Sequence, residues 1–109
     1  MDIKTILIDE RSFTGTAEEN SSGLHALLSG ELGFPAYYGG NLAALSDCLG
    51  DVCEPVRFVV DFESAEHYRD CIAMLEGEAD GSPTWLERFV RVIARTVLEN
   101  GCLELVLAC

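Results

Sequence analysis

Hydrophobic residues along this chain follow two kinds of spacing. Three dense apolar runs, at residues 3–8, 56–62 and 103–108, are typical of strands in a sheet that is covered on at least one face. Between these runs, apolar residues recur every three or four positions, which is the spacing of one face of a helix. The predicted order is strand, two helices, strand, two helices, strand.

Capping residues predict where the four helices begin and end. Ser, Thr and Asn accept a backbone N–H of the first helical turn, and glycine commonly ends a helix. Residues 12–20 read as polar and irregular, so the first helix is expected to start after them. The expected starts are Ser21 or Ser22, Asn41, Ser64 and Thr84 (with Glu87 in a capping box), and the expected stops are Gly33, Gly50, Gly77 and Gly101.

The helical crossovers set the expected topology. Each is long enough to bring the chain back to the same edge of the sheet, so neighbouring strands should be parallel. We therefore expect an α/β fold in two layers, a small three-stranded parallel sheet packed by about four helices. The chain has 109 residues, 49% of them hydrophobic, without an internal repeat or linker, and should form one domain over residues 1–109.

A loop with two adjacent tyrosines departs from this pattern. The sequence AYYGGN places both aromatic residues beside glycines, directly before a helix. Aromatic residues on loops often contact another molecule, although one of the two can equally pack against the core while the glycines serve the turn. The candidate binding residues of this loop are Tyr37, Tyr38, Gly39, Gly40 and Asn41.

The helix after this loop has a nearly bare outer face. At about 100° per residue, Asp47 lies opposite the apolar stripe, and Ala43, Ala44 and Asp51 flank it on the outer side. Small side chains let another molecule approach closely, although alanine also simply favours helix. These four residues extend the candidate binding surface, with a carboxylate at its centre.

Net charge narrows the class of partner. The chain has 7 Lys and Arg against 19 Asp and Glu, a formal charge of -12, which argues against nucleic acid and anionic membranes. An acidic surface either attracts a basic partner or only keeps the protein soluble. No apolar run reaches the length of roughly 18 residues that a membrane span needs. The first residues lack a secretion signal, so we expect a cytoplasmic protein.

Catalytic motifs and metal-binding patterns are missing from the sequence. Neither His25 nor His67 sits in a motif, and both are expected at the surface or at an edge. Asp47 and Asp51 are one turn apart, a common spacing on helix surfaces. The five cysteines form no CxxC and no Cys/His cluster at zinc spacing, and are expected to act as small hydrophobic residues. We therefore expect neither an enzyme nor a cofactor or metal.

The stretch FPAYYGGNLAALSD, residues 34–47, resembles the barstar family, intracellular inhibitors of secreted bacterial ribonucleases. The family pattern is approximately a hydrophobic residue, Pro, any residue, Tyr-Tyr-Gly, any residue, Asn-Leu, Asp-Ala-Leu, any residue, Asp. Matching segments in the same order cover almost the whole chain. The resemblance implies a small parallel sheet with helices, and a loop and second helix that plug the active site of a basic, barnase-like ribonuclease.

The resemblance also implies roles for single residues. Asp47 corresponds to the carboxylate that takes the place of a substrate phosphate, and Tyr37 to the tyrosine that stacks on the enzyme's catalytic histidine. Gly39, Gly40 and Asn41 correspond to residues in close backbone contact with the enzyme. The free protein is expected to be a monomer.

Three positions depart from the family pattern. Ala43 stands where the family has a second helix aspartate, Ser46 where it has an aromatic residue, and Thr96 where it has a glutamate that reaches the ribonuclease. Losing a charge that faces a buried cation typically costs about 2 kcal/mol or more. Glu99, one turn after Thr96, is a candidate replacement. Two hypotheses stay open: a ribonuclease inhibitor, or an immunity or regulatory module of the same fold for a different basic toxin.

Overall fold

The computed structural model describes residues 3–78, 81 and 83–109. Its elements follow the predicted order, with a short 3-10 turn added after the first strand. The strands are β1 (Lys4–Asp9), β2 (Val56–Asp61) and β3 (Leu103–Ala108). The helices are η1 (Glu10–Ser12, the 3-10 turn), α1 (Ala17–Leu32), α2 (Leu42–Gly50), α3 (Ala65–Leu75) and α4 (Trp85–Glu99).

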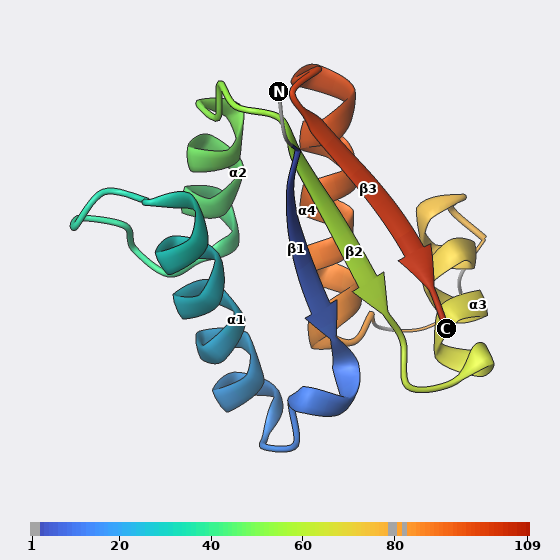
Figure 1. The fold of residues 1–109 in the computed structure, drawn as a ribbon. Coiled ribbons are helices and arrows are strands. Elements are labelled where there is room, and N and C mark those ends of the chain that lie inside the picture. Colours follow the sequence, from blue (N-terminus) through green and yellow to red (C-terminus); the bar gives the residue numbers. More distant parts are fainter. Residues whose placement is uncertain (1–2, 79–80, 82) are drawn as a thin grey trace.

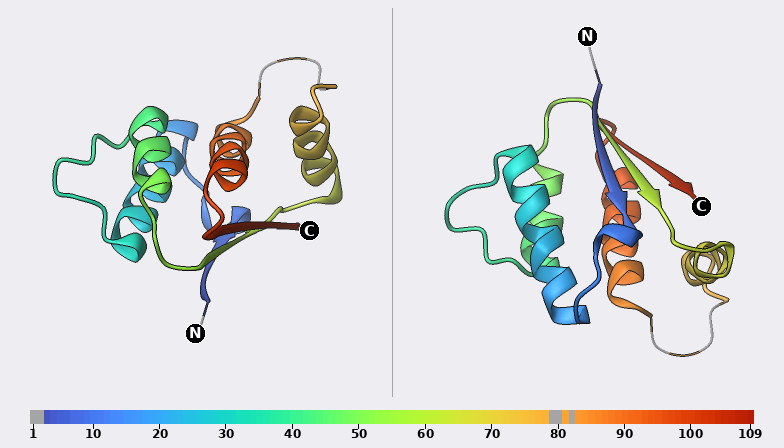
Figure 2. Two further views of the ribbon diagram at one scale, coloured as in Figure 1. Left: turned by 90° about the horizontal axis from the view of Figure 1, so that it is seen from above. Right: turned by 60° about the horizontal axis from the view of Figure 1, so that its bottom comes forward.

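The three strands form one parallel sheet in the order β1-β2-β3, with β2 at the centre (Figure 1). The register pairs the ends of β1 and β2, Asp9 with Asp61, so both strands finish at the same edge. Seen from above, the helices lie on one side of the sheet, with α4 between α2 and α3 (Figure 2). The predicted two-layer α/β fold is confirmed.

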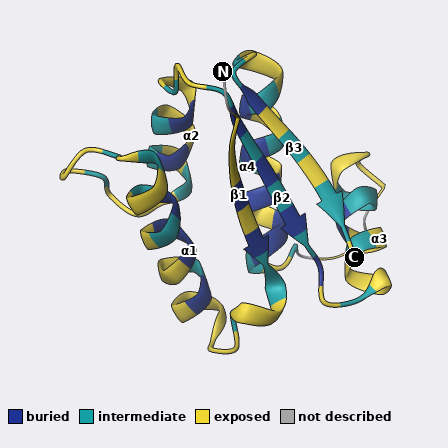
Figure 3. Cartoon of the chain, viewed as in Figure 1, coloured by how far each residue is buried: buried dark blue, intermediate teal, exposed yellow. Residues whose placement is uncertain are grey.

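The core lies between the sheet and the helices, with α4 at its centre and buried side chains from α1, α2 and α3. Side chains alternate along each strand, so Ile6, Ile8, Phe58 and Val60 are buried, whereas Leu7 on the opposite face is exposed. Figure 3 shows the buried positions along β2 and on the inner side of α4. The predicted stripe of α4 is buried along most of its length and meets this inner face of the sheet.

The first helix begins earlier than the sequence predicts. Thr16 is its N-cap and accepts the backbone N–H of Glu19 at 3.1 Å. The Asn20 side chain is buried and bonds both the N–H (3.0 Å) and the carbonyl (3.2 Å) of Gly15. The prediction of an irregular segment over 12–20 therefore holds for 13–16 but is wrong for 17–20, where polar side chains belong to the first turn of α1.

The other predicted caps are confirmed at Asn41, Ser64 and Thr84, including the capping box with Glu87.

Only part of the cysteine prediction holds: Cys71 is buried in the core, but Cys53 and Cys109 are exposed. Of the predicted loop over 78–83, residues 79, 80 and 82 lie outside the described residues. In the part of the chain that the structure describes, no helix is long and apolar enough to cross a bilayer.

Candidate partner-binding site

The loop between α1 and α2 is anchored by Tyr38. Gly33 ends α1 in the left-handed conformation, at φ 65°, and the Tyr38 N–H donates to the Pro35 carbonyl at 2.9 Å, closing a turn. The Tyr38 ring lies 4.9 Å from the Phe34 ring and 5.6 Å from the His25 ring, centroid to centroid. The loop is therefore held to α1 by an aromatic cluster.

A buried polar pair lies under this cluster. His25 is 5% exposed, its ring is 4.6 Å from that of Phe89, and its Nδ1 is hydrogen-bonded to the Tyr38 hydroxyl. Burial lowers the pKa of His25, while burial and, secondarily, Cys48 raise the pKa of Tyr38 to about 12. Both groups are thus neutral at pH 7, and one hydrogen bond joins them. The expectation of a surface or edge position is wrong for His25.

Tyr37 points the other way and is 87% exposed. An exposed tyrosine in an anchored loop offers a large contact area, and ordering its side chain on binding costs little conformational entropy. The alternative left open by the sequence is therefore resolved: Tyr38 packs inward and braces the loop, and Tyr37 is free to contact a partner.

The turn into α2 depends on its two glycines. Gly40 has φ 65°, a conformation that a residue with Cβ adopts at a cost of about 1 kcal/mol. A Cβ on Gly39 would lie 3.1 Å from the Asn41 Nδ2. The Asn41 side chain then caps α2 by accepting the Ala44 N–H at 2.8 Å. These local interactions set where α2 begins.

The far end of α2 is held by a side chain from α4's terminus. Asn100 donates to the carbonyls of Leu49 (3.0 Å) and Val52 (2.9 Å). Leu45 and Leu49 are buried in the core. With one face packed and both ends bonded, α2 presents a fixed outer face. Asn100 gives no signal in the sequence, because its partners lie about 50 positions away.

An open pocket of about 470 Å³ lies beside this face. It brings together Tyr37, Asp47 and Asp51, which the sequence predicts, and adds Glu31 and Glu54, which it does not. Lys4 is the cation among the described lining residues and pairs with Glu31 at 3.6 Å, which leaves three carboxylates of the lining without it. The arrangement offers several acceptors to a cationic side chain.

Cys48 also lines the pocket. Burial, then the neighbouring carboxylates of Asp51 and Asp47, raise the pKa of its thiol. The protonated form is a poor nucleophile and metal ligand. Cys48 therefore serves as part of the packed wall.

Comparison with known proteins identifies the family of this chain. The family model described as "Barstar (barnase inhibitor)" matches residues 9–94. The chain belongs to the barstar family. A relative in Bacillus subtilis (strain 168), named "Putative ribonuclease inhibitor YrdF", is 49% identical over 59 residues, 53% of this chain and 59% of that protein. The match thus spans less than two thirds of the relative's length, and both names point to an inhibitor rather than an enzyme.

Among the positions at which this chain departs from the barstar family pattern, Ala43 is exposed on α2, beside half-buried Ala44. Thr96 is 2% exposed, and its hydroxyl donates to the Val92 carbonyl at 2.9 Å. Thr96 is therefore not part of the exposed face, which corrects its place among the candidate binding residues. Glu99, by contrast, is exposed.

Proposed function

We propose that this chain is an inhibitor of a basic, barnase-like ribonuclease, which it blocks with the 37–41 loop and the outer face of α2. In this role it acts in the cytoplasm as a monomer. Asp47 takes the place of a substrate phosphate, and Tyr37 stacks on the enzyme's active-site ring. The observation that carries the proposal is the pocket in which Tyr37, Asp47 and Asp51 meet beside a braced loop.

The charge of the pocket supports a cationic partner despite the departures from the family pattern. Ala43 and Thr96 supply no carboxylate, but Asp51, Glu31 and Glu54 line the same pocket as Asp47. Arginine side chains of a ribonuclease active site fit such a set of acceptors, because guanidinium groups bind carboxylates in pairs of hydrogen bonds. The cation-binding role is thus shared among carboxylates at new positions.

The direct test is inhibition of a panel of small guanyl-preferring microbial ribonucleases by the purified chain. Asp47→Asn should weaken inhibition by about 2 kcal/mol or more, roughly thirtyfold. Tyr37→Ala should weaken it as well, whereas Tyr37→Phe, which keeps the ring, should retain most of it. Asp70→Asn, an exposed charge change on α3, is the matched control and should inhibit like wild type.

The second candidate is an immunity or regulatory module for a different basic toxin, favoured by the carboxylates missing at positions 43 and 96. A folded wild-type protein that inhibits no ribonuclease of the panel would support it. Capture of a basic protein encoded by a neighbouring gene, lost in Asp47→Asn, would identify that target. If wild type, Asp47→Asn and Tyr37→Ala inhibit equally, the assignment of the interface is wrong under both candidates.

A further inference from the structure

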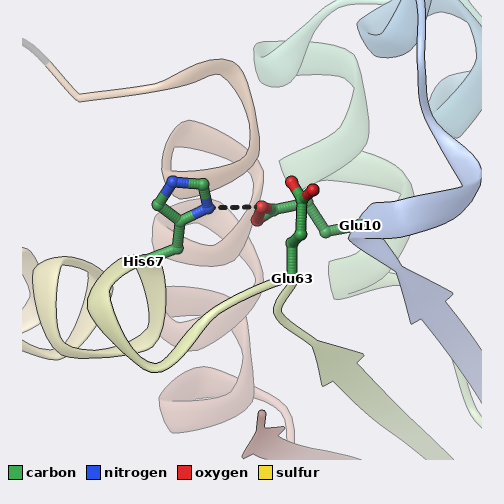
Figure 4. Close-up of side chains that lie close together, drawn as sticks. All are labelled: Glu10, Glu63 and His67. Atoms are coloured by element: carbon green, nitrogen blue, oxygen red, sulfur yellow. Dashed lines mark hydrogen bonds and ion pairs between the residues drawn. The ribbon is translucent and has the colours of Figure 1, made fainter.

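A second group of side chains lies at the opposite end of the sheet from the candidate partner-binding site. Glu10, Glu63 and His67 each offer one ligand atom, and these atoms lie within 4.8 Å of one another (Figure 4). The His67 Nδ1 and a Glu10 carboxylate oxygen are 2.6 Å apart. An imidazole and two carboxylates therefore converge from three separate segments.

The fold itself brings these three residues together. Because β1 and β2 are parallel and end in register, the residues that follow them emerge at one edge of the sheet. Glu10 comes directly after β1, and Glu63 lies in the loop after β2. The Ser64 cap, which accepts the His67 N–H at 3.2 Å, turns the first turn of α3 towards the same edge.

Within this group Glu10 is paired with His67, and the nearby arginine does not join it. Arg11 pairs with the flanking carboxylates Asp9 (3.2 Å) and Asp61 (2.6 Å) instead. Among the described residues, no lysine or arginine forms an ion pair with Glu10 or Glu63. The Glu10 side chain is also largely enclosed, at 14% exposure, so its carboxylate is held in place.

The group borders a pocket of about 200 Å³. Its polar lining residues are Glu10, Glu63, His67, Thr84 and Glu87, and Phe13, Phe62 and Trp85 are among its apolar lining residues. Apolar walls around a metal site control solvent access and the local dielectric. The pocket has room for an ion with its bound water.

We propose that Glu10, Glu63 and His67 bind a zinc ion, with water completing a four-coordinate site. One imidazole nitrogen and two carboxylate oxygens are ligands that Zn²⁺ accepts, whereas Mg²⁺ and Ca²⁺ favour all-oxygen sites. Ligands of a tetrahedral zinc ion lie about 3.3 Å apart, within the range of separations in this group. Small side-chain rotations are therefore enough to form the site.

Zinc at this position would connect the ends of β1 and β2 to the start of α3. An ion that binds only the folded chain stabilises it in proportion to its concentration. Because α3 lies on the other side of α4 from α2 (Figure 2), the site is separate from the candidate partner-binding site. Ribonuclease inhibition can fail while zinc binding persists, and the reverse also holds.

The test is calorimetric titration of the full chain with ZnCl₂ after removal of metals by a chelator. Wild type should bind one ion per chain, with a rise in Tm that EDTA reverses. His67→Gln and Glu63→Gln should each weaken binding about tenfold or more. Glu66→Gln, the same charge change one residue from His67, is the matched control and should bind like wild type.

The five cysteines require a second measurement, because thiolates also bind zinc. Co²⁺ bound in place of zinc should show d–d bands and no near-ultraviolet thiolate-to-metal charge transfer. A thiolate band, or zinc binding that survives both ligand variants, would place the metal on cysteines and overturn the proposal. So would no zinc binding by wild type, or binding of Mg²⁺ or Ca²⁺ more tightly than Zn²⁺.

Discussion

The Tyr38 hydroxyl and the His25 imidazole show how single residues support the candidate partner-binding site without facing the partner. Their hydrogen bond lies beneath the loop, and aromatic rings of Phe34 and Phe89 cover it. Protonation of His25 would place a charge in this buried environment and leave its ring nitrogens able only to donate. The buried pair that braces the loop is therefore sensitive to pH.

This pair predicts a loss of stability in mild acid. Because burial lowers the pKa of His25 in the folded state, the unfolded chain binds the proton first, near its ordinary pKa of about 6.5. The stabilising contribution is complete above that pH and is lost as pH falls through it towards the lower folded pKa. The slope from this one group is at most about 1.4 kcal/mol per pH unit.

The measurement is the free energy of unfolding in urea of wild type and His25→Gln, at pH values of about 7, 6 and 5. Glutamine can still accept the Tyr38 hydroxyl but does not titrate. Wild type should lose stability relative to His25→Gln as pH falls, which separates His25 from the carboxylates common to both proteins. Parallel pH curves for the two proteins would contradict the prediction.

At the scale of one element, α2 is a short helix whose outer face depends on how its ends are fixed. Asn41 caps its start, and Asn100 bonds the carbonyls of Leu49 and Val52 at its end. Short helices are marginal alone, so packing and end contacts supply most of their order. The geometry of Asp47 and Asp51 thus depends on a side chain that faces away from the partner.

We predict that Asn100→Ala destabilises the chain by about 2 kcal/mol, because partly buried carbonyls lose their donor. Hydrogen exchange in the last turn of α2 should speed up more than exchange in α1. Inhibition by Asn100→Ala should also weaken, although Asp47 itself is not mutated, because the end of α2 is less well held. Asp70→Asn, the exposed change on α3, is the control, and equal stability of the two variants would show that the bonds of Asn100 contribute little.

At the scale of the whole molecule, charge governs how fast a partner arrives. The chain carries a net charge of -12, and the candidate pocket is lined by four carboxylates and one lysine. Acidic surfaces steer basic partners, mainly by raising the association rate. A barstar-like role therefore predicts that the association rate depends strongly on salt, whereas the dissociation rate of the complex depends on it only weakly.

Stopped-flow association with the inhibited ribonuclease tests this. Raising NaCl from about 0.05 M to about 0.5 M shortens the Debye length from about 14 Å to about 4 Å. The association rate should fall about tenfold or more, while the dissociation rate changes much less. An association rate that does not depend on salt would contradict the role assigned to charge.

Much of the fold could be predicted because its signals are local. Helical spacing, the caps at Asn41, Ser64 and Thr84, and crossovers long enough for parallel strands all act within a few residues or one connection. The start of α1 was the exception, because Asn20 bonds backward to Gly15 inside a stretch with no apolar stripe.

The candidate site was predictable only as a stretch of chain. The residues of the 37–47 segment indicate a binding surface, but which tyrosine faces outward depends on His25 and Phe34, which lie in and just after another helix. Glu31 and Glu54 join the pocket only when the end of α1 and the start of β2 come together.

By itself, the sequence determined the order of elements, the parallel sheet, the acidic character and the segment that carries Tyr37 and Asp47. The tertiary structure decided which side chains are presented: it buried Thr96 and His25, placed Asn100 on the end of α2, and gathered Glu10, Glu63 and His67. The physical reason is range. Caps and periodicity act between near neighbours, while the bonds of Asn100 with Leu49 and of Glu10 with His67 join residues about 50 positions apart, for which no spacing rule exists.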